Sequence, residues 1–512
     1  MTGYDYIVVG AGTAGSVLAA RLSESEDIRV LLLEAGPANG PDAVSVPPAW
    51  PTLIGSEVDW GYSTVEQPGL AGAVRPYPRG KMLGGSSAIN AMMYIRGDRS
   101  SYDDWAADGA PAWAYSDLLP YFRRAERVAG RDSHFRGTHG PMTPTRASNV
   151  HAVARAFEEA FVELGYPVAD DLNGADREGV SWPELNVVDG VRQSAADAYL
   201  RPVFDRPNLT VLTGALARRL LLSGSRCNGV EYSLAGYLDT ADVAGEVILC
   251  AGAIGSPHLL QLSGIGPADT LRWHGIDVVV DLPGVGDNLA DHPLGSVVYE
   301  AAKPVPAGTN NHGDALAVLR TSAVLGAPDV QLLFLDVPLV RPTGLAPADV
   351  YAIAFSALRP HSRGSVMLAS SDPETAPVID PGLLSDERDM STMLAALRLT
   401  REIGGARALA EWRRAEALPG PSVRTEAQER AYLRRSSGTY FHPVGTCRLG
   451  IDERAVTDLE LRVRGIDGLR VVDASVMPSI PGANTNATVL AIAERAAAII
   501  AGRDRVGGAV MA

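Results

Sequence analysis

Cysteine and long apolar runs are both scarce in this chain. Over 512 residues there are only three cysteines, too widely spaced for a disulfide framework or a metal-binding knuckle: Cys227, Cys250 and Cys447. We therefore expect no metal site and a cytoplasmic protein. The longest candidate for a membrane span, Val489–Ile500, is interrupted by Glu494 and Arg495. A strand-like run begins already at Tyr4, which leaves no room for a signal peptide.

Positive charge is also in short supply. The chain has 45 Lys and Arg residues against 60 Asp and Glu residues, a net charge of −15. Nucleic acids and anionic membranes attract basic surfaces, so this balance argues against both as partners. Hydrophobic residues nevertheless make up 46% of the chain, which is ample for a buried core. The length of the chain indicates two or three domains.

The chain opens with a glycine-rich turn between a strand and a helix. A short apolar strand, Tyr6–Val9, runs into glycines at 10, 12 and 15, and a helical pattern follows over Ser16–Leu22. The run Arg29–Leu33 is typical of a second strand, and Glu34 stands at its carboxyl end. This order of strand, turn, helix, strand and acid predicts a dinucleotide-binding unit with a parallel sheet.

Each residue of that turn has a physical reason. Gly10 permits the tight turn, Gly12 lets the backbone approach a pyrophosphate, and Gly15 lets the helix pack closely on the strand. The helix N-terminus offers free N–H groups to the pyrophosphate. Glu34 suits a ribose 2′-hydroxyl and would repel a 2′-phosphate. The turn therefore predicts an adenine dinucleotide other than NADP, and leaves NAD and FAD open.

The remaining strand-like runs are far apart in the chain, which indicates that the dinucleotide domain is discontinuous. They are Leu209–Leu212, Gly245–Cys250, Val278–Val280 and Leu469–Val472. The stretch 296–435 mixes strand-like runs with helical patterns and predicts a second domain, a sheet with helices: strands Val330–Phe334 and Val350–Leu358, helices Asp389–Ile403 and Glu426–Arg434. Segments rich in proline and glycine predict loops over Pro304–Gly313 and Pro338–Pro347.

Two further glycine-rich stretches bear on the cofactor. Arg79–Asn90 contains paired glycines and serines, which can wrap a phosphate or a planar ring with backbone N–H groups but also suit an ordinary helix cap. The stretch Ala251–Gly266 follows a strand, and Ser256-Pro257 predicts the start of a helix there, because proline fits a first turn.

With these motifs the chain resembles the glucose–methanol–choline (GMC) oxidoreductases, a family of flavoenzymes. The resemblance rests on the opening turn and on four later stretches in order: Gly252–Gly266, Asp281–His292, Tyr440–Gly450 and Val472–Ser475. It implies an α/β fold, with a discontinuous Rossmann-like FAD-binding domain (residues 1–155, 206–295 and 440–512). It also implies an inserted α+β substrate domain with an antiparallel sheet and helices (156–205 and 296–439).

The cofactor implied by the resemblance is FAD, bound without a covalent link. Some members attach FAD through a histidine after the paired glycines, and Ser87–Asn90 contains none. The cofactor-binding residues that the resemblance implies are Gly10, Gly12, Thr13, Ala14, Gly15, Glu34, Ala35, Arg79, Leu83, Gly84, Gly85, Ser86, Asn90, Ala91, Met92, Ala217, Ala251, Gly252, Asp473, Ala474, Thr485, Asn486 and Thr488.

Two side chains near the C-terminus are the candidates for catalysis. His442 stands between Phe441 and Pro443, a rigid and partly apolar setting that favours the neutral base. The resemblance matches it to the family's active-site histidine and matches Asn484 to the polar residue beside it. Asparagine is not a base, so His442 is expected to accept the hydroxyl proton of the alcohol. Asn484 can hydrogen-bond the alcohol oxygen. A helix over Ala487–Ala501 would point its N-terminus at the flavin pyrimidine and stabilise negative charge there.

The resemblance implies oxidation of an alcohol to an aldehyde or ketone, with the proton passing to His442 and hydride to flavin N5. Oxygen or another acceptor then reoxidises the flavin. Two alternatives stay open: an FAD-containing enzyme like the hydroxynitrile lyases, without net redox, and a non-catalytic flavin-binding protein. The alcohol is also open. Choline would require an aromatic cage, for which Tyr440, Phe441, Trp60 and Tyr94 are available. Methionines near the flavin turn favour an apolar pocket instead (Met82, Met92 and Met93).

Overall fold

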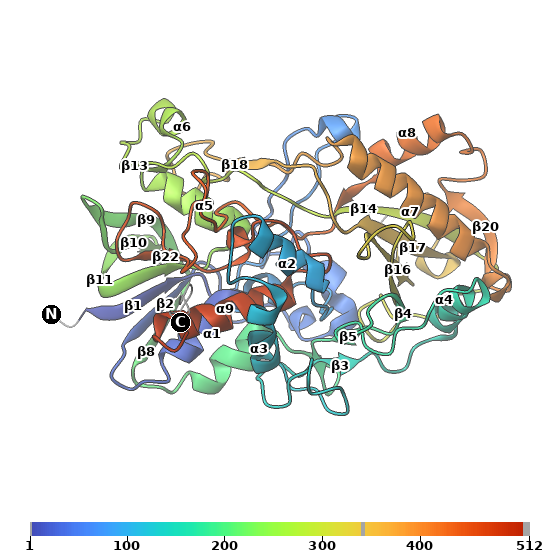
Figure 1. Cartoon of the computed structure of the whole chain (residues 1–512), viewed down its shortest axis with the longest axis horizontal. Coiled ribbons are helices and arrows are strands. Elements are labelled where there is room, and N and C mark those ends of the chain that lie inside the picture. Colours follow the sequence, from blue (N-terminus) through green and yellow to red (C-terminus); the bar gives the residue numbers. More distant parts are fainter. Residues whose placement is uncertain (1–2, 339–343, 505–512) are drawn as a thin grey trace, which may run out of the picture.

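Two seven-stranded sheets, each with its own helices, organise the chain (Figure 1). The computed structural model describes residues 3–338 and 344–504. The first sheet runs in the order β8-β2-β1-β11-β10-β9, with β22 paired to β11. Its strands are β1 (Tyr4–Val9), β2 (Val30–Glu34), β8 (Leu209–Thr213), β9 (Ala215–Ser223), β10 (Arg226–Leu234), β11 (Tyr237–Leu249) and β22 (Leu469–Val471).

The centre of this sheet is parallel and comes from three distant parts of the chain. β1 pairs in parallel with β2 and β11, β2 with β8, and β11 with β22. β2 is buried along its whole length, as expected of a strand covered on both faces. The predicted discontinuous, Rossmann-like arrangement is thus confirmed.

Two strand predictions differ from the structure. The strand predicted at Gly245–Cys250 begins at Tyr237, because its first half leaves the parallel sheet and pairs antiparallel with β10. That half is largely exposed, so it lacks the continuous apolar run that marks the buried half. The strand predicted at Val278–Val280 is wrong: only Val280–Asp281 (β13) is extended, and it pairs with β12 (Ile265–Gly266) outside the main sheet.

Helices α1 (Thr13–Leu22), α3 (Tyr115–Ala125) and α9 (Asn486–Ile500) pack together beside this sheet (Figure 1). Buried Glu494 of α9 binds Arg21 of α1 at 2.7 Å and Arg124 of α3 at 3.0 Å. A buried charge is tolerated when it is paired in this way, and this pairing holds the two ends of the chain together.

Helix α5 (Gly252–Leu262) begins four residues before the predicted start at Ser256-Pro257. Pro257 therefore lies inside the helix, where its missing N–H leaves the carbonyl of Ala253 without its helical donor. The hydroxyl of Thr446 donates to that carbonyl at 2.6 Å. The structure satisfies the broken helical bond from a distant segment, which no local pattern could indicate.

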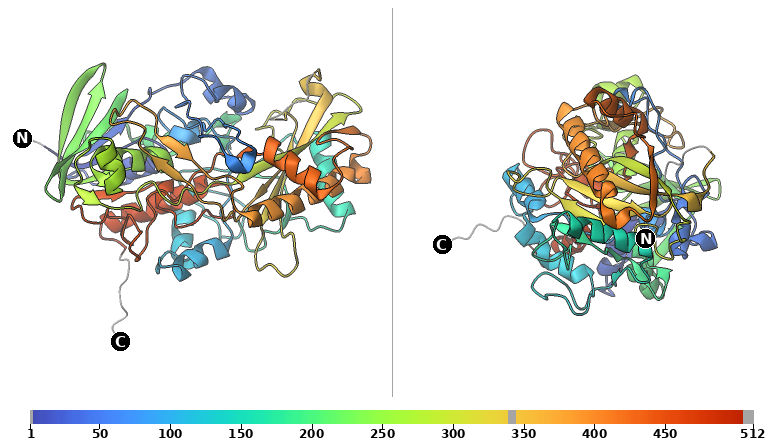
Figure 2. Two further views of the ribbon diagram at one scale, coloured as in Figure 1. Left: turned by 90° about the horizontal axis from the view of Figure 1, so that it is seen from above. Right: turned by 90° about the vertical axis from the view of Figure 1, so that its right-hand side faces the viewer.

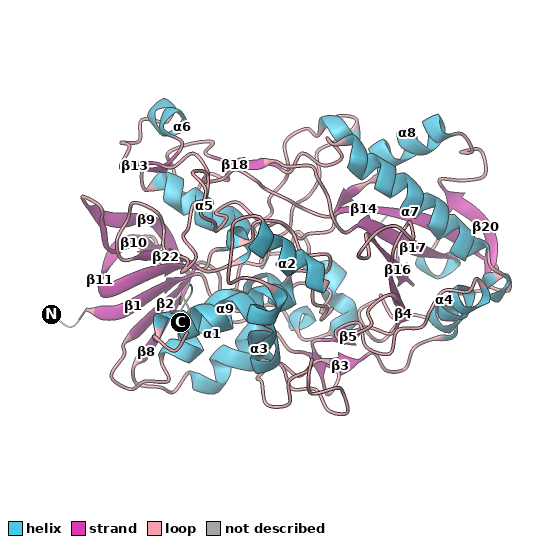
Figure 3. Ribbon diagram, viewed as in Figure 1, coloured by secondary structure: helices cyan, strands magenta, loops and turns pink. Residues whose placement is uncertain are grey.

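The second sheet is antiparallel and runs in the order β20-β14-β17-β16-β15-β4, with β21 paired to β14 (Figure 3). Its strands are β4 (Gly179–Ser181), β14 (Pro293–Ala301), β15 (Leu316–Leu319), β16 (Val330–Leu335), β17 (Val350–Ala357), β20 (Arg413–Leu418) and β21 (Gly438–Thr439). Helix α7 (Glu387–Gly405) packs on β14 and β17, and α4 (Ala152–Glu163) and α8 (Glu426–Ser436) pack against α7 (Figure 2). This sheet with helices confirms the predicted second unit.

The predicted organisation also includes two loops and the boundaries between the domains. The loop predicted at Pro304–Gly313 is confirmed, whereas residues 339–343 of the loop predicted at Pro338–Pro347 lie outside the described residues. The turn Ala196–Leu200, assigned above to the substrate domain, packs against α1. The exact domain boundaries therefore stay a prediction. In the described ranges, no helix combines the length and apolar character that a membrane crossing requires. The three cysteines are buried and unpaired.

The first turn brings strand, helix and neighbouring strand into backbone contact. Gly10 has a φ of +99°, which favours glycine, and a Cβ there would lie 2.6 Å from the carbonyl oxygen of Cys250. A Cβ at Gly15 would lie only 1.8 Å from the carbonyl oxygen of Gly10. The predicted close packing of helix on strand is present, and it leaves no room for a methyl group at either position.

Substituting Gly15→Ala is expected to destabilise the protein by ~3 kcal/mol or more. The added Cβ would overlap the backbone carbonyl of Gly10, which cannot move away. Thermal unfolding followed by circular dichroism should show a clearly lower midpoint. The matched control is Gly405→Ala at the end of α7, where a Cβ would meet nothing within 4 Å. That variant should unfold at the same temperature or slightly higher, since alanine favours the helix by up to ~1 kcal/mol. Equal midpoints for the two variants would contradict the packing described.

Candidate active site

A cavity of about 490 Å³ lies between the two sheets and is lined by residues from both. His442 and Asn484 line it, as do all but four of the predicted cofactor residues: Gly10, Gly12, Thr13, Ala14, Glu34, Ala35, Arg79, Gly85, Ser86, Asn90, Ala91, Met92, Ala217, Ala251, Gly252, Asp473, Ala474, Thr485 and Asn486. The fold thus brings the opening turn and the C-terminal motifs to one cavity.

Four predicted cofactor residues do not line the cavity. Gly15 faces the backbone of Gly10, and Leu83 is buried in the core of the first sheet. Gly84 forms a left-handed turn with φ +93° whose Cβ position faces Ser194. The hydroxyl of Thr488 hydrogen-bonds that of Tyr102 at 2.8 Å. These four positions shape the cavity walls and do not face its interior.

Two glycine-rich turns meet at one end of the cavity. A Cβ at Gly85 would lie 2.7 Å from the Cα of Gly12, so the turns touch. A Cβ at Gly12 would meet no atom closer than 3.9 Å, which leaves that backbone open to the cavity. Beside it, the carboxylate of Glu34 accepts hydrogen bonds from the N–H groups of Ala11 (2.9 Å) and Gly36 (2.8 Å). Burial raises the pKa of Glu34 to about 7.

Helices α1 and α9 both begin at the cavity wall. The hydroxyl of Thr13 in the first turn of α1 donates to the side-chain oxygen of Asn486, the first residue of α9, at 2.7 Å. Neither first turn contains an acid, and neither N-cap side chain accepts a hydrogen bond in the described chain. The N–H groups and partial positive charges of both helix ends are therefore free to stabilise a negatively charged group in the cavity.

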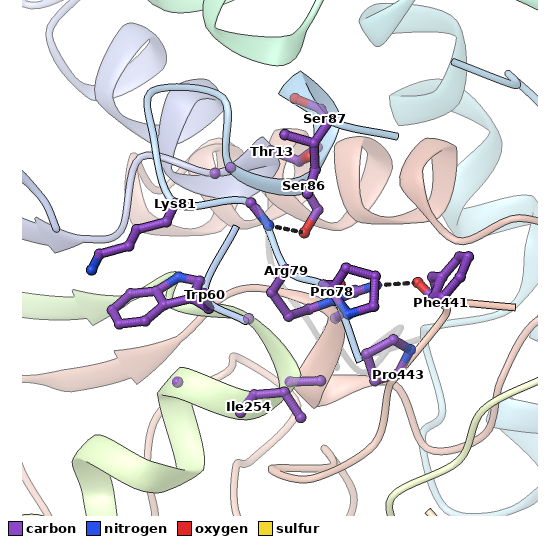
Figure 4. A pocket seen from close by; sticks show the side chains of 18 of the residues that line it. Thr13, Trp60, Pro78, Arg79, Lys81, Ser86, Ser87, Ile254, Phe441 and Pro443 are labelled. Carbon is purple, nitrogen blue, oxygen red and sulfur yellow. Dashed lines mark hydrogen bonds between the residues drawn. The ribbon is translucent and has the colours of Figure 1, made fainter. Parts of the chain in front are cut away.

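Arg79 brings a buried positive charge to the cavity wall. Its guanidinium donates to the carbonyl of Phe441 at 2.6 Å, and the two residues lie side by side with Pro443 nearby (Figure 4). Among the described residues it forms no salt bridge, and burial lowers its pKa. A cation with only carbonyl partners favours an anionic group in the space that it faces.

The sequence patterns did not indicate several other lining residues. Lys81, one of only two lysines, lies over the ring of Trp60 at 4.6 Å, and both line the cavity (Figure 4). His258 also lines it, with a pKa lowered by burial to about 4. Lys81 stands within the glycine-rich stretch Arg79–Asn90, so its position in the sequence could have indicated that it lines the cavity. Trp60, named above only as an available aromatic residue, and His258 reach the cavity through tertiary packing.

The position of His442 depends on a buried carboxylate. Asp291 accepts hydrogen bonds from the backbone N–H of His442 at 2.9 Å and from the hydroxyl of Thr439. Between them, Phe441 adopts a left-handed conformation with φ +66°. Such a conformation is costly for a bulky residue and persists only where surrounding contacts impose it. Here Asp291 and Arg79 hold both sides of the turn.

The imidazole of His442 lies between two polar side chains. Its Nε2 is 3.2 Å from the Nδ2 of Asn484, and its Nδ1 is 3.0 Å from the Nδ1 of His292. His442 is 9% exposed and His292 is fully buried. Burial lowers the pKa of His442 well below 6.5, with contributions from nearby His292 and Arg79. A neutral imidazole beside an amide at a cavity wall can accept a proton from a bound hydroxyl group.

The cavity fits FAD. The open backbone at Gly12 and the free ends of α1 and α9 offer N–H groups to a pyrophosphate and to an electron-rich ring. Two further donors or acceptors that line the cavity, Asn486 Nδ2 and His258 Nε2, are buried and have no hydrogen-bond partner in the described chain. Unsatisfied buried polar atoms are costly, and a polar cofactor that reaches them would remove that cost.

Known proteins resemble this chain along nearly its whole length. A 39% identical relative is the oxygen-dependent choline dehydrogenase of Brucella anthropi, matched over 98% of this chain and 96% of that protein. The crystal structure of pyridoxine 4-oxidase from Mesorbium loti has 39% identity and a TM-score of 0.94, covering 98% of this chain and all of the other. A fungal aryl-alcohol oxidase has 25% identity and a TM-score of 0.86, covering 98% and 99%.

The family models agree with these similarities. The N-terminal model of the GMC oxidoreductases matches residues 4–294, and the C-terminal model matches residues 360–493. Together they cover the first sheet and both candidate catalytic side chains, whereas β15, β16, β17 and most of β14 lie between the two matched ranges. The chain therefore belongs to the GMC oxidoreductases, FAD-binding enzymes that oxidise CH–OH groups.

Proposed function

We propose that His442 is the general base of this alcohol-oxidising enzyme and that Asn484 orients the substrate oxygen. The observation that carries the proposal is the pair itself, a buried neutral imidazole whose Nε2 lies 3.2 Å from an amide at the cavity wall. The alcohol proton passes to His442 Nε2, and the Asn484 amide donates to the oxygen as negative charge develops on it. Bound FAD supplies the hydride acceptor.

The proposal also covers how FAD is bound, where the protein is located and what reoxidises the flavin. We propose that FAD is held without a covalent link, since no histidine stands in Ser87–Asn90. The predicted cofactor residues that line the cavity are its proposed contacts. A cytoplasmic location stays a prediction. Oxygen and other electron acceptors both remain candidates for reoxidation, and comparing peroxide formation with dye reduction distinguishes them.

The end of the cavity nearest His442 favours an uncharged alcohol with an apolar or aromatic body. The second sheet contributes only apolar side chains there: Leu294 of β14, Leu333 and Leu335 of β16, and Ala354 of β17. The described acids that line the cavity are each engaged elsewhere. Glu34 binds backbone N–H groups, Glu374 binds Arg218 at 2.7 Å, and Asp473 binds Ser256 at 2.5 Å. Among the described residues, no lining carboxylate is therefore free to balance the charge of a quaternary ammonium group.

Among polar groups near His442, the Tyr440 hydroxyl lines the cavity. It is buried, and its one polar neighbour, the side chain of Asn484, does not form a well-aligned hydrogen bond with it in the described residues. The Tyr440 ring lies 4.5 Å from that of His442, centre to centre. A substrate with one polar ring atom or substituent would satisfy this hydroxyl, whereas a saturated hydrocarbon alcohol would leave it unpaired. We therefore favour a heteroaryl alcohol or an aryl alcohol with a polar ring substituent.

Replacing His442 with alanine is expected to slow the reaction by about 10²–10⁴-fold, the usual contribution of a general base. The measurement is the rate at which an alcohol bleaches the flavin absorbance in anaerobic stopped flow. Flavin content, read from the absorbance of the purified variant, controls for loss of cofactor. A variant that keeps its flavin and its rate would exclude His442 as the base.

The ratio kcat/KM is expected to stay level from about pH 8 down to pH 6.5 and to fall only well below it. Burial depresses the pKa of His442, so the base keeps its free lone pair as the pH drops through the ordinary histidine range. Initial rates in overlapping buffers, with flavin absorbance checked at each pH, provide the test. An acid limb at or above pH 6.5 would contradict the buried, neutral base.

Choline and its uncharged isostere 3,3-dimethyl-1-butanol separate charge from shape. We expect choline to reduce the flavin at least about 100-fold less efficiently than the isostere, a difference of about 2.7 kcal/mol, because no carboxylate compensates its charge. Benzyl alcohols should be better than either. The readout is the second-order rate of anaerobic flavin reduction. Choline reacting as fast as its isostere would show that the cavity accommodates the cation.

A further inference from the structure

His292 lies behind His442, on the side away from the cavity. It immediately precedes β14, is fully buried and does not line the cavity. Its Nε2 is 3.1 Å from the backbone carbonyl oxygen of Leu358, the residue after β17. Its Nδ1 is 3.0 Å from His442 Nδ1, and the two rings stand nearly perpendicular at 87°. Both ring nitrogens of His292 therefore have defined partners.

The backbone carbonyls of Leu358 and Pro481 both act on the His292 ring, and the hydrogen bond of 3.1 Å to Leu358 determines which nitrogen carries the proton. A carbonyl oxygen can only accept, so His292 Nε2 must be the donor. Burial lowers the pKa of His292 to about 4, so the ring is neutral at physiological pH and carries one proton. Its Nδ1 is then an acceptor. The only proton available for the contact between the two Nδ1 atoms is the one on His442.

The same reasoning continues across His442 to the cavity. With its single proton on Nδ1, His442 presents the lone pair of Nε2 to Asn484 and to the substrate. Asn484 must then direct its NH₂ group toward that lone pair. Its oxygen in turn accepts from the Nε2 of Gln331 at 3.3 Å. The four hydrogen bonds are thus all donated in one direction. They run from Gln331 in β16 through Asn484, His442 and His292 to the carbonyl of Leu358.

We propose that His292 is a positioning residue that holds the proton of His442 on Nδ1 and thereby keeps Nε2 free to accept the substrate proton. This rests on the proposed role of His442 as the base. In the reaction, the alcohol O–H bond breaks and its proton binds His442 Nε2, while the carbon gives hydride to bound FAD. The resulting imidazolium keeps its Nδ1–H donated to the lone pair of the neutral His292 Nδ1. Without that acceptor, His442 could carry its proton on Nε2 and could not act as a base.

Two variants of nearly equal size separate this role from simple packing. His292→Leu removes the acceptor. His292→Asn keeps an oxygen at the position of Nδ1, one bond from the same carbon. We expect His292→Leu to slow anaerobic flavin reduction by about 100-fold or more, in line with the loss caused when a catalytic histidine takes the wrong tautomer. His292→Asn should recover at least about tenfold of that loss.

His151→Leu is the matched control. It also replaces a largely buried imidazole, whose nitrogens have no hydrogen-bond partner in the described residues, and it lies apart from the cavity lining. We expect it to keep the wild-type rate. His442→Ala is measured in parallel. If His442→Ala keeps its rate, the proposed function fails. If His442→Ala is slow while His292→Leu matches His151→Leu, only the role of His292 is overturned.

The position of the proton can be observed directly in the wild-type enzyme, and His442→Ala serves only to identify the signals. In wild-type holoenzyme labelled with ¹⁵N-histidine, the His442 signals are identified by their absence in His442→Ala. We expect Nδ1 to be the protonated nitrogen and Nε2 the unprotonated one. The reverse assignment in the oxidised enzyme at neutral pH would overturn the proposal.

Discussion

The site depends on one short pairing between two segments that are far apart in the chain. Ala290 and Val444 exchange backbone hydrogen bonds, each at 3.0 Å, and the N–H of Tyr440 donates to the carbonyl of His292 at 2.9 Å. Within this pairing Asp291 anchors the backbone of His442, 151 residues away in sequence. The pairing sets the ring of His442 between the cavity and His292. A buried carboxylate needs such partners, and here they are the groups that hold the histidine in place.

The charge at the cavity wall is opposite in sign to the net charge of the whole protein. The protein carries a net charge of −15, yet the cavity wall collects Arg79, Lys81 and the free N-termini of α1 and α9. The surface charge concerns solubility and partners, whereas the local field acts on the group within the cavity. A site that must stabilise a pyrophosphate and an electron-rich ring needs that local reversal. The neutral His442 is consistent with it, since an adjacent guanidinium disfavours a second cation.

A feature could be predicted from the sequence where it depends on residues that are close together in the chain. The opening turn was predictable because its local backbone requires glycine: Gly10 has a φ of +99°, and Gly15 packs against the carbonyl of Gly10. Val278–Val280 looked like a strand of the main sheet because an apolar run does not reveal its pairing partner. Pro257 looked like a helix start because the compensating hydroxyl of Thr446 lies 193 residues away along the chain from the carbonyl that it satisfies. His442 and Asn484 were found through the family's motifs. The role of His292 depends on a ring contact across 150 residues, which no spacing indicates.

The division between the two sheets explains how substrate preference can vary while the chemistry stays the same. Asn484 and the glycine-rich turns come from loops and helix ends that the first sheet supports, whereas His442 follows β21 at the end of the second sheet. The apolar wall comes from strands of the second sheet. Side chains alternate along a strand, so Leu333 and Leu335 both face the cavity while the intervening Phe334 is fully buried in the core. Substitutions at cavity-facing positions such as Leu294 or Ala354 would change the wall without moving the base. Relatives that are equally similar in sequence to this chain can therefore act on different alcohols, and the wall chemistry is a better guide to the substrate than overall identity.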